Sequence, residues 1–213
     1  MQRIWFAVTA VVAFAGLAAQ TVVSVSAESG SDTDDTVAGR VFTMLCYFTI
    51  QSNVIVCATH TLLARDPSRS GPVFRAFRLA GIVGIAVTGL VYHTILRSLY
   101  ELSGLAHVAD LLLHTATPLL AVLGWLLFGP RGLTSVRTAV HALLFPALYL
   151  VFTLVRGPFA DFYPYPFVDV RTHGYGVVLL NSLGVAALFL ALAFGALALD
   201  RVLARRAERG SPR

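Results

Sequence analysis

The stretch LLLHTATPLLAVLGWLLF, residues 111 to 128, decides the fold class of this chain. A run of about 18 or more uncharged, mostly apolar residues is long enough for a helix to cross a lipid bilayer. The only titratable side chain in the stretch is His114, and Asp110 stands one helical turn before it. The stretch therefore predicts a membrane span, and it raises the question of why a span carries an imidazole with a carboxylate beside it.

The composition of the whole chain agrees with a membrane protein. Of 213 residues, 57% are hydrophobic and 13% are charged, and the mean hydropathy is +0.76, whereas a soluble domain has about 25% charged residues. Because the loops are short, we expect one all-α domain, residues 1–213, that is an integral membrane bundle of six transmembrane helices. Apolar runs place the spans at Ile4 to Ser26, Val41 to Ala64, Leu79 to Leu96, Ala109 to Phe128, Ala139 to Val155 and Tyr175 to Leu199.

The arginines predict the orientation of the bundle, since the chain contains no lysine. All of the 16 basic residues except Arg40, Arg97, Arg156 and Arg171 fall on the side of the two chain ends. The positive-inside rule therefore places both termini in the cytoplasm. Acidic residues crowd the first loop on the opposite side, at Glu28, Asp32, Asp34 and Asp35. The net charge of +5 is then a topology signal, and it does not indicate nucleic-acid binding.

The first apolar run has two interpretations. It follows MQR and ends in SVSA before Glu28, which also fits a secretory signal with its cleavage site. A signal's apolar core has roughly 7 to 15 residues, and this run is longer, so a retained span is favoured. Both interpretations leave the other five spans in the same orientation.

Polar side chains within the predicted spans gather in the half of the bundle near its external end. At a rise of about 1.5 Å per residue, Thr49 lies roughly 12 Å and His114 roughly 8 Å from that end, so contact is possible. Polar groups in hydrocarbon are unfavourable unless partnered, and a layer of them indicates interhelical packing or a functional site. The other members of the layer are Gln20, Asn53, Tyr92, His93, Asp110 and Asn181.

Thr49 and His114 have the side chains that nucleophilic catalysis on an ester requires. An imidazole that accepts the proton of a hydroxyl makes that hydroxyl a nucleophile. Asp110 would hold the second ring nitrogen of His114 and fix its tautomer, and Asn53 or Tyr92 would donate to an oxyanion. Two alternatives stay open: Asp110 caps the start of its span, and Asn53 bonds between helices.

Other chemistries fit the sequence less well. His93, His107, Asp110 and His114 are possible metal ligands, but their spacing matches no metal motif, and we predict neither a metal nor another cofactor. A non-catalytic protein that binds or carries a small lipid or a quinone-like ligand in the polar layer is the main rival to an enzyme. A structural or assembly protein of the membrane is the second.

The segment GPFADFYPYPFVDV, residues 157 to 170, differs from the rest of the chain. Its three prolines, Pro158, Pro164 and Pro166, argue against a regular helix. Its aromatic residues fit a belt at the level of the lipid headgroups. They equally fit a lid over an opening between the spans.

Three of these motifs together resemble a known family. YFTIQSN at 47–53, LLLHTATPLL at 111–120 and FYPYPF at 162–167 look like the androgen-induced-gene-like family of multi-span membrane proteins. That family includes threonine hydrolases of fatty-acid esters of hydroxy fatty acids and has bacterial six-span relatives. The resemblance implies Thr49 as nucleophile and His114 as its partner, although the family's histidine and proline are one residue further apart.

From the sequence we therefore expect an intramembrane hydrolase or acyltransferase that acts on a lipid-like ester, with membrane lipids as its other partners. Arginine without lysine, together with abundant Ala, Val and Gly, is typical of a GC-rich bacterial genome, which predicts the bacterial cytoplasmic membrane. The sequence does not predict the oligomeric state.

Overall fold

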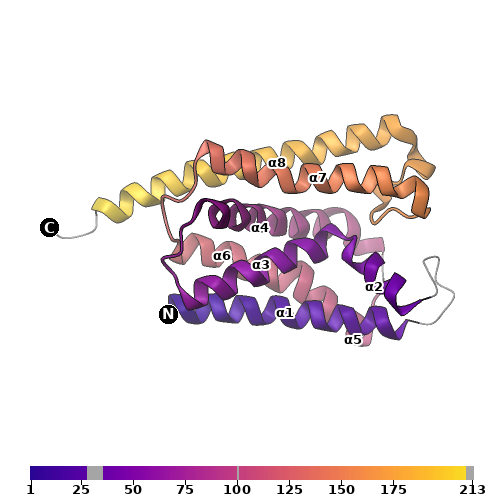
Figure 1. The fold of residues 1–213 in the computed structure, drawn as a ribbon, viewed down its shortest axis with the longest axis horizontal. Helices are drawn as coiled ribbons and strands as arrows, with labels where there is room; N and C mark the ends of the chain where they lie inside the picture. The colour runs from indigo at the N-terminus through magenta and orange to yellow at the C-terminus, as the bar shows by residue number, and fades with distance from the viewer. Residues whose placement is uncertain (28–35, 100, 210–213) are drawn as a thin grey trace.

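The computed structural model describes residues 1–27, 36–99 and 101–209, and this part of the chain is a bundle of helices without a strand (Figure 1). Five helices are long and apolar enough to cross a membrane, and one bent pair passes the same test together, as the six predicted spans require. The all-α membrane bundle is thus confirmed. The predicted acidic loop of Glu28, Asp32, Asp34 and Asp35 lies outside the described residues.

The elements follow one another in an up-and-down order. In chain order they are α1 (Gln2–Ser26), α2 (Val37–Leu45), α3 (Phe48–Arg65), α4 (Pro72–Val91), a π-helix (Tyr92–Leu96), a 3₁₀ turn (Arg97–Leu99), α5 (Gly104–Leu111), a second π-helix (Leu112–Ala116), α6 (Thr117–Phe128), α7 (Val136–Ala160), a 3₁₀ turn (Pro166–Val168) and α8 (Val170–Arg209). The start of α1 and the end of α8 lie at the same end of the bundle (Figure 1). We call the opposite end, where α1 ends and α3 begins, the distal end. Which end faces the cytoplasm stays a prediction.

Helix α4 is the centre of the bundle. It packs against α3 and α6 on one side and against α7 and α8 on the other (Figure 1). Small residues allow the close approach to α3, because a Cβ added at Gly84 would lie 3.1 Å from Ser52 Oγ. Helices α7 and α8 form a separate layer on the face of α4 opposite to α3 and α6.

The second predicted span, Val41 to Ala64, is wrong as a single helix. Helices α2 and α3 are bent by 75° at a break at Cys46 and Tyr47. Tyr47 has extended backbone angles, φ −79° and ψ 132°, and α3 restarts after it. Thr49 consequently lies in the first turn of a helix, where backbone N–H groups have no partner within the helix.

The fourth span is widened in its middle. Residues Leu112–Ala116 form a π-helix in which the N–H of Thr117 donates to the carbonyl of Leu112. Pro118 has no N–H with which to bond the carbonyl of His114 four residues earlier, so the regular α pattern fails here. Such π segments are frequent at functional sites, and this one carries His114.

The prolines act differently along the fifth span and the segment that follows it. The sequence prediction that Pro158 forbids a helix is wrong, since α7 runs through Pro146 and Pro158 to Ala160. The helix is terminated by the C-cap residue Asp161, which has a left-handed backbone with φ 47°. The connection from Asp161 to Asp169 that follows contains only the short 3₁₀ turn, as the prolines predicted.

Candidate active site

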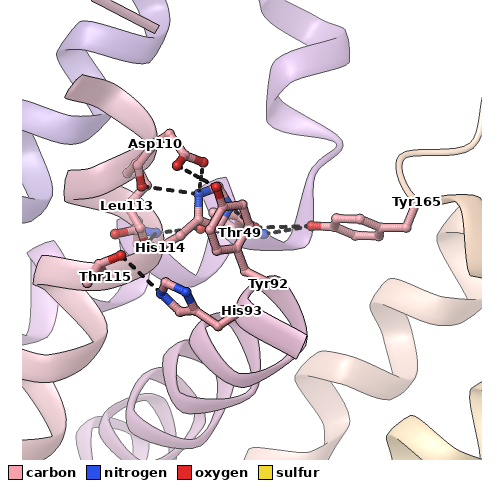
Figure 2. A network of polar contacts seen from close by, with 9 residues as sticks. Thr49, Tyr92, His93, Asp110, Leu113, His114, Thr115 and Tyr165 are labelled. Carbon is pink, nitrogen blue, oxygen red and sulfur yellow. Dashed lines mark hydrogen bonds and ion pairs between the residues drawn. The ribbon is translucent and has the colours of Figure 1, made fainter. Parts of the chain in front are cut away.

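The structure brings Thr49 and His114 together at the distal end, as Figure 2 shows. The Thr49 Oγ1 atom lies 3.3 Å from the Nε2 atom of His114. Thr49 is 6% exposed, and the side chain of His114 is 19% exposed. A buried hydroxyl thus faces an imidazole within hydrogen-bond distance.

Asp110 fixes the tautomer of His114. Its Oδ1 atom lies 2.9 Å from His114 Nδ1, and the backbone carbonyl of Asp110 lies 3.3 Å from the same nitrogen. Both oxygens are acceptors, so the proton of a neutral imidazole belongs on Nδ1. Nε2 then has the lone pair, and the Thr49 hydroxyl donates to it. The alternative that Asp110 caps its helix is wrong, because α5 begins at Gly104 with Ser103 as its N-cap residue.

Tyr92 supports the same pair of side chains. Its hydroxyl donates to Asp110 Oδ2 at 2.5 Å, and its ring stacks on the ring of His114 with centroids 4.1 Å apart and planes 17° apart. A carboxylate that accepts a hydrogen bond on each of its two oxygens is held more firmly than a carboxylate that accepts only one. Because the Tyr92 hydroxyl donates its hydrogen bond to Asp110, Tyr92 helps to orient the imidazole and does not serve the predicted oxyanion role.

Tyr165 is the member of the site that sequence reasoning missed. Its hydroxyl lies 3.2 Å from Thr49 Oγ1 and accepts the backbone N–H of Thr49 at 3.1 Å. Since the Thr49 proton is directed to His114, we assign the proton of the contact between the two hydroxyls to Tyr165. Tyr165, Thr49, His114 and Asp110 then form one directed chain of hydrogen bonds, which we call the relay (Figure 2).

Tyr165 comes from the connection between α7 and α8, far from Thr49 in sequence. Its ring stacks on Phe167 with centroids 5.4 Å apart, and Tyr47 meets it edge-on at 5.7 Å. The two prolines that flank it, Pro164 and Pro166, restrict the backbone. They are the feature of the sequence that could have indicated a fixed position for Tyr165. The aromatic connection therefore delivers one hydroxyl to the relay, and the lid and the belt both stay predictions.

The two ends of this connection are clamped by one arginine. Arg171 pairs with Asp161 at 2.7 Å and with Asp169 at 2.8 Å. The side-chain hydrogen bond from Arg171 lowers the pKa of Asp169 below its ordinary value, against a smaller opposing effect of burial. Within the connection, Tyr163 packs against Gly157 of α7 so closely that a Cβ there would lie 2.1 Å from its ring. These contacts hold the segment that carries Tyr165.

The remaining predicted site residues lie around the relay without joining it. Asn53 is fully buried, and its amide donates to the carbonyls of Thr49 at 2.8 Å and Leu113 at 3.3 Å. It therefore ties α3 to the π-helix that carries His114, as the interhelical alternative predicted, and its N–H groups are engaged by these two carbonyls. Gln20 bonds Ser24 at 3.5 Å and lines the adjacent cavity.

Two predicted residues have hydrogen-bond partners outside the relay, although the His93 ring also meets Tyr92 edge-on with centroids 5.1 Å apart. His93 is exposed, and its Nε2 atom lies 3.1 Å from Thr115 Oγ1, a second pair of the same residue types without a carboxylate in the described contacts. Asn181 donates to the carbonyl of Phe167 at 3.0 Å and so supports the aromatic connection.

A cavity of about 370 Å³, which we call the distal cavity, lies beside the relay. Thr49, Tyr92, Asp110, His114 and Tyr165 line it. Its wall continues to polar side chains near the distal end of the bundle, among them Gln20, Ser24, Arg40 and Thr43. His114 and Asp110 thus face a space that reaches toward the polar end of the molecule.

A second cavity of about 340 Å³, which we call the inter-layer cavity, lies between α4 and the layer of α7 and α8. Its lining is almost entirely apolar and includes Val87, Val91, Leu143, Leu150, Val185 and Phe189. Thr49, Leu96 and Tyr165 line both cavities. The Thr49 hydroxyl therefore stands where the distal cavity, whose lining includes polar side chains, meets the almost entirely apolar inter-layer cavity.

The metal alternative finds no support among the described residues, where no group of three or more His, Cys, Asp or Glu side chains is placed to hold an ion. The possible ligand His93 faces Thr115, and the His114 nitrogens contact Asp110 and Thr49. The observed contacts place a hydroxyl, an imidazole and a carboxylate in series, the order in which a nucleophile, its base and an orienting acid would be arranged.

A scan against protein-family models and searches of curated proteins and of solved structures found no match.

Proposed function

We propose that this protein is an intramembrane hydrolase or acyltransferase that acts on a lipid-like ester through Thr49. The observation that carries the proposal is the relay: a buried hydroxyl 3.3 Å from the basic nitrogen of an imidazole, whose other nitrogen lies 2.9 Å from a carboxylate. The same set of roles recurs in unrelated hydrolases because an oriented base that takes the proton of a hydroxyl makes it a better nucleophile.

The first half of the reaction forms an acyl-threonine. Thr49 Oγ1 attacks the ester carbonyl carbon while its proton passes to His114 Nε2. The bond from that carbon to the alcohol oxygen then breaks, and His114 Nε2 returns the proton to the leaving alcohol.

The second half regenerates the enzyme. A water molecule, or the hydroxyl of an acceptor alcohol, gives its proton to Nε2 and attacks the acyl carbon. The bond to Thr49 Oγ1 breaks, and that oxygen takes the proton back from His114. The products are an acid, or a new ester, and the alcohol released in the first half, so atoms and charge balance in both cases.

Tyr165 fits the role of oxyanion donor better than Asn53 or Tyr92. Its hydroxyl lies 3.2 Å from the nucleophile, whereas the Asn53 amide and the Tyr92 hydroxyl donate elsewhere. When a carbonyl carbon bonds to Thr49, the developing O⁻ replaces Thr49 Oγ1 as the acceptor of the Tyr165 proton. The Thr49 backbone N–H, which now donates to Tyr165, stands close enough to contribute a second donor.

The resemblance to the androgen-induced-gene-like family supports the same assignment, since it implies Thr49 and His114 independently of their contact. The apolar helices fit a multi-pass membrane protein, and we propose the bacterial cytoplasmic membrane as its location, with the distal end outside. The relay would then lie in the outer half of the bilayer, within reach of lipid esters.

A fluorophosphonate probe tests the proposal, because it labels an activated hydroxyl covalently. We expect the purified wild-type protein to be labelled and Thr49→Ala to be unlabelled. Thr115→Ala is the matched control: it removes the hydroxyl of the other Thr and His pair and should be labelled like the wild type. Wild-type protein left unlabelled while it binds a lipid or quinone would support the carrier, and equal labelling of Thr49→Ala would exclude Thr49 as nucleophile.

Tyr165→Phe should lower kcat for ester hydrolysis by about 10²-fold with little change in KM, the usual effect of losing one oxyanion donor. The phenyl ring keeps the packing on Phe167 and Tyr47, so thermal stability serves as the check on folding. Tyr163→Phe alters the neighbouring tyrosine, which packs on Gly157 instead, and should retain the wild-type rate. A Tyr165→Phe enzyme with normal kcat would remove the tyrosine from the mechanism.

A further inference from the structure

The two cavities meet at Thr49, and their positions relative to His114 are not equivalent. His114 and Asp110 line the distal cavity, whereas the inter-layer cavity is lined by Thr49 and Tyr165 without either of them. We propose that the inter-layer cavity holds the acyl chain of the ester and that the distal cavity holds the leaving alcohol. This inference rests on the proposed function, and it adds the direction in which the substrate lies.

The path of the proton decides that direction. His114 Nε2 takes the proton of Thr49 and must return it to the oxygen of the departing alcohol, so this oxygen lies on the side of His114. The incoming water is deprotonated by the same nitrogen and arrives from the same side. The acyl carbon stays bonded to Thr49 throughout, so its chain extends to the other side of the hydroxyl, into the inter-layer cavity.

The shape and the lining of the inter-layer cavity fit a hydrocarbon chain. Along α8 its wall runs from Ser182 to Leu190, which is about 12 Å at the rise of an α-helix. From α4 and α7 its wall is formed by Val87, Val91, Leu143 and Leu150. An extended alkyl chain that starts at Thr49 finds apolar surface along most of this length, and the wall is interrupted by the hydroxyls of Thr88, Tyr149 and Ser182.

The same cavity reaches the membrane-facing surface of the bundle. Ala147 of α7 and Ala186 and Leu190 of α8 line it and are also exposed. In a bilayer, an opening between α7 and α8 at these residues faces lipid chains. An acyl chain can therefore enter sideways from the membrane, while water reaches Thr49 through the distal cavity.

The cavity wall has three buried hydroxyls without a hydrogen-bond partner among the described residues, those of Thr88, Tyr149 and Ser182. Two of them, Thr88 Oγ1 and Ser182 Oγ, separate a hydrocarbon occupant from a polar one. If the occupant is an alkyl chain, the Thr88→Val and Ser182→Ala variants should bind a long-chain fatty-acid methyl ester in the inter-layer cavity as tightly as the parent protein or more tightly. If the occupant has a polar group there, both variants lose binding, which would overturn the proposal.

Photo-cross-linking in the Thr49→Ala protein locates the chain without any need for catalysis. The probe is a long-chain fatty-acid methyl ester with a diazirine at the end of its chain, and mass spectrometry identifies the labelled peptides. We expect labelling of the α7 and α8 segments that line the inter-layer cavity. Labelling confined to α1, α2 and α5 around the distal cavity would reverse the orientation and overturn the proposal.

Neighbouring alanines of α8 provide a matched pair of variants. Ala186 lines the cavity and Ala187 does not, and both are exposed, so a larger side chain at either position leaves the core of the bundle intact. Ala186→Phe should reduce cross-linking of the long-chain probe by about tenfold or more, and Ala187→Phe should match the parent. Equal cross-linking in the two variants would contradict the assignment.

Hydrolysis by the same variants gives a second, separable readout. With Thr49 present, Ala186→Phe should lower kcat/KM for a palmitoyl ester by about tenfold or more and leave that for a butyryl ester near the wild-type value. A cross-link in the inter-layer cavity without any hydrolysis would support the acyl-chain site and refute the proposed enzyme. Hydrolysis together with a cross-link in the distal cavity would support the enzyme and refute the acyl-chain site.

Discussion

We expect a His114→Ala variant to hydrolyse lipid-like esters with a kcat at least about 10⁴-fold below that of the wild-type protein, a loss typical of removing the base of such a relay. The imidazole is the group within 3.3 Å that accepts the Thr49 proton, and an unassisted threonine hydroxyl is a poor nucleophile near neutral pH. The measurement is initial-rate kinetics in detergent or in vesicles, with fluorophosphonate labelling as a parallel readout.

His93→Ala is the control for this prediction. His93 is also a histidine bonded to a threonine hydroxyl, at 3.1 Å from Thr115, but it is exposed and lies outside both cavities. We expect it to retain the wild-type rate. If His114→Ala and His93→Ala had equal rates, the relay would be a packing feature, and the carrier function would become the better account of the cavities.

The second large effect is expected at Asp110. An Asp110→Asn variant should lose about 10³- to 10⁴-fold in kcat, by analogy with the acid of the serine hydrolase triad. Asparagine offers an N–H group where His114 Nδ1 now meets a carboxylate oxygen at 2.9 Å, which favours the tautomer that places the ring proton on Nε2. Nε2 would then be unable to accept the proton of Thr49.

This prediction has its own control at the other end of the bundle. Asp66 is exposed and accepts hydrogen bonds from Ser68, which lower its pKa, so Asp66→Asn changes the charge of the protein equally without touching the relay. Its rate should match that of the wild type. Asp110→Asn protein that folds and keeps its rate would show that the carboxylate only anchors Tyr92, and the triad would reduce to a pair.

Part of the candidate site could be predicted from the sequence because it depends on distance along helices. Thr49 and His114 each lie a short way from the same predicted end of their spans, so a shared depth followed from helical rise alone. Asp110 and His114 are four residues apart, which places them on one face of a helix. The contact between Asp110 and His114 needed no knowledge of how the spans pack.

The other predicted members illustrate the limit of that reasoning. A shared depth does not fix the direction in which a side chain points around the bundle. His93 and Asn181 fall in the same layer as Thr49, yet one bonds Thr115 and the other bonds the backbone of Phe167. Asn53 shares a helix face with Thr49, but its amide bonds the backbone of Leu113.

What the sequence by itself determined is the class of protein: six apolar runs that must bury their backbone polar groups as helices in a membrane. The tertiary structure decided the site. The break between α2 and α3 frees the N–H of Thr49, and the α7–α8 connection brings Tyr165 to it across 116 positions of sequence. Hydrophobic length is a local property of the chain, whereas a hydroxyl placed between two cavities depends on how separate helices pack, and no local pattern records that.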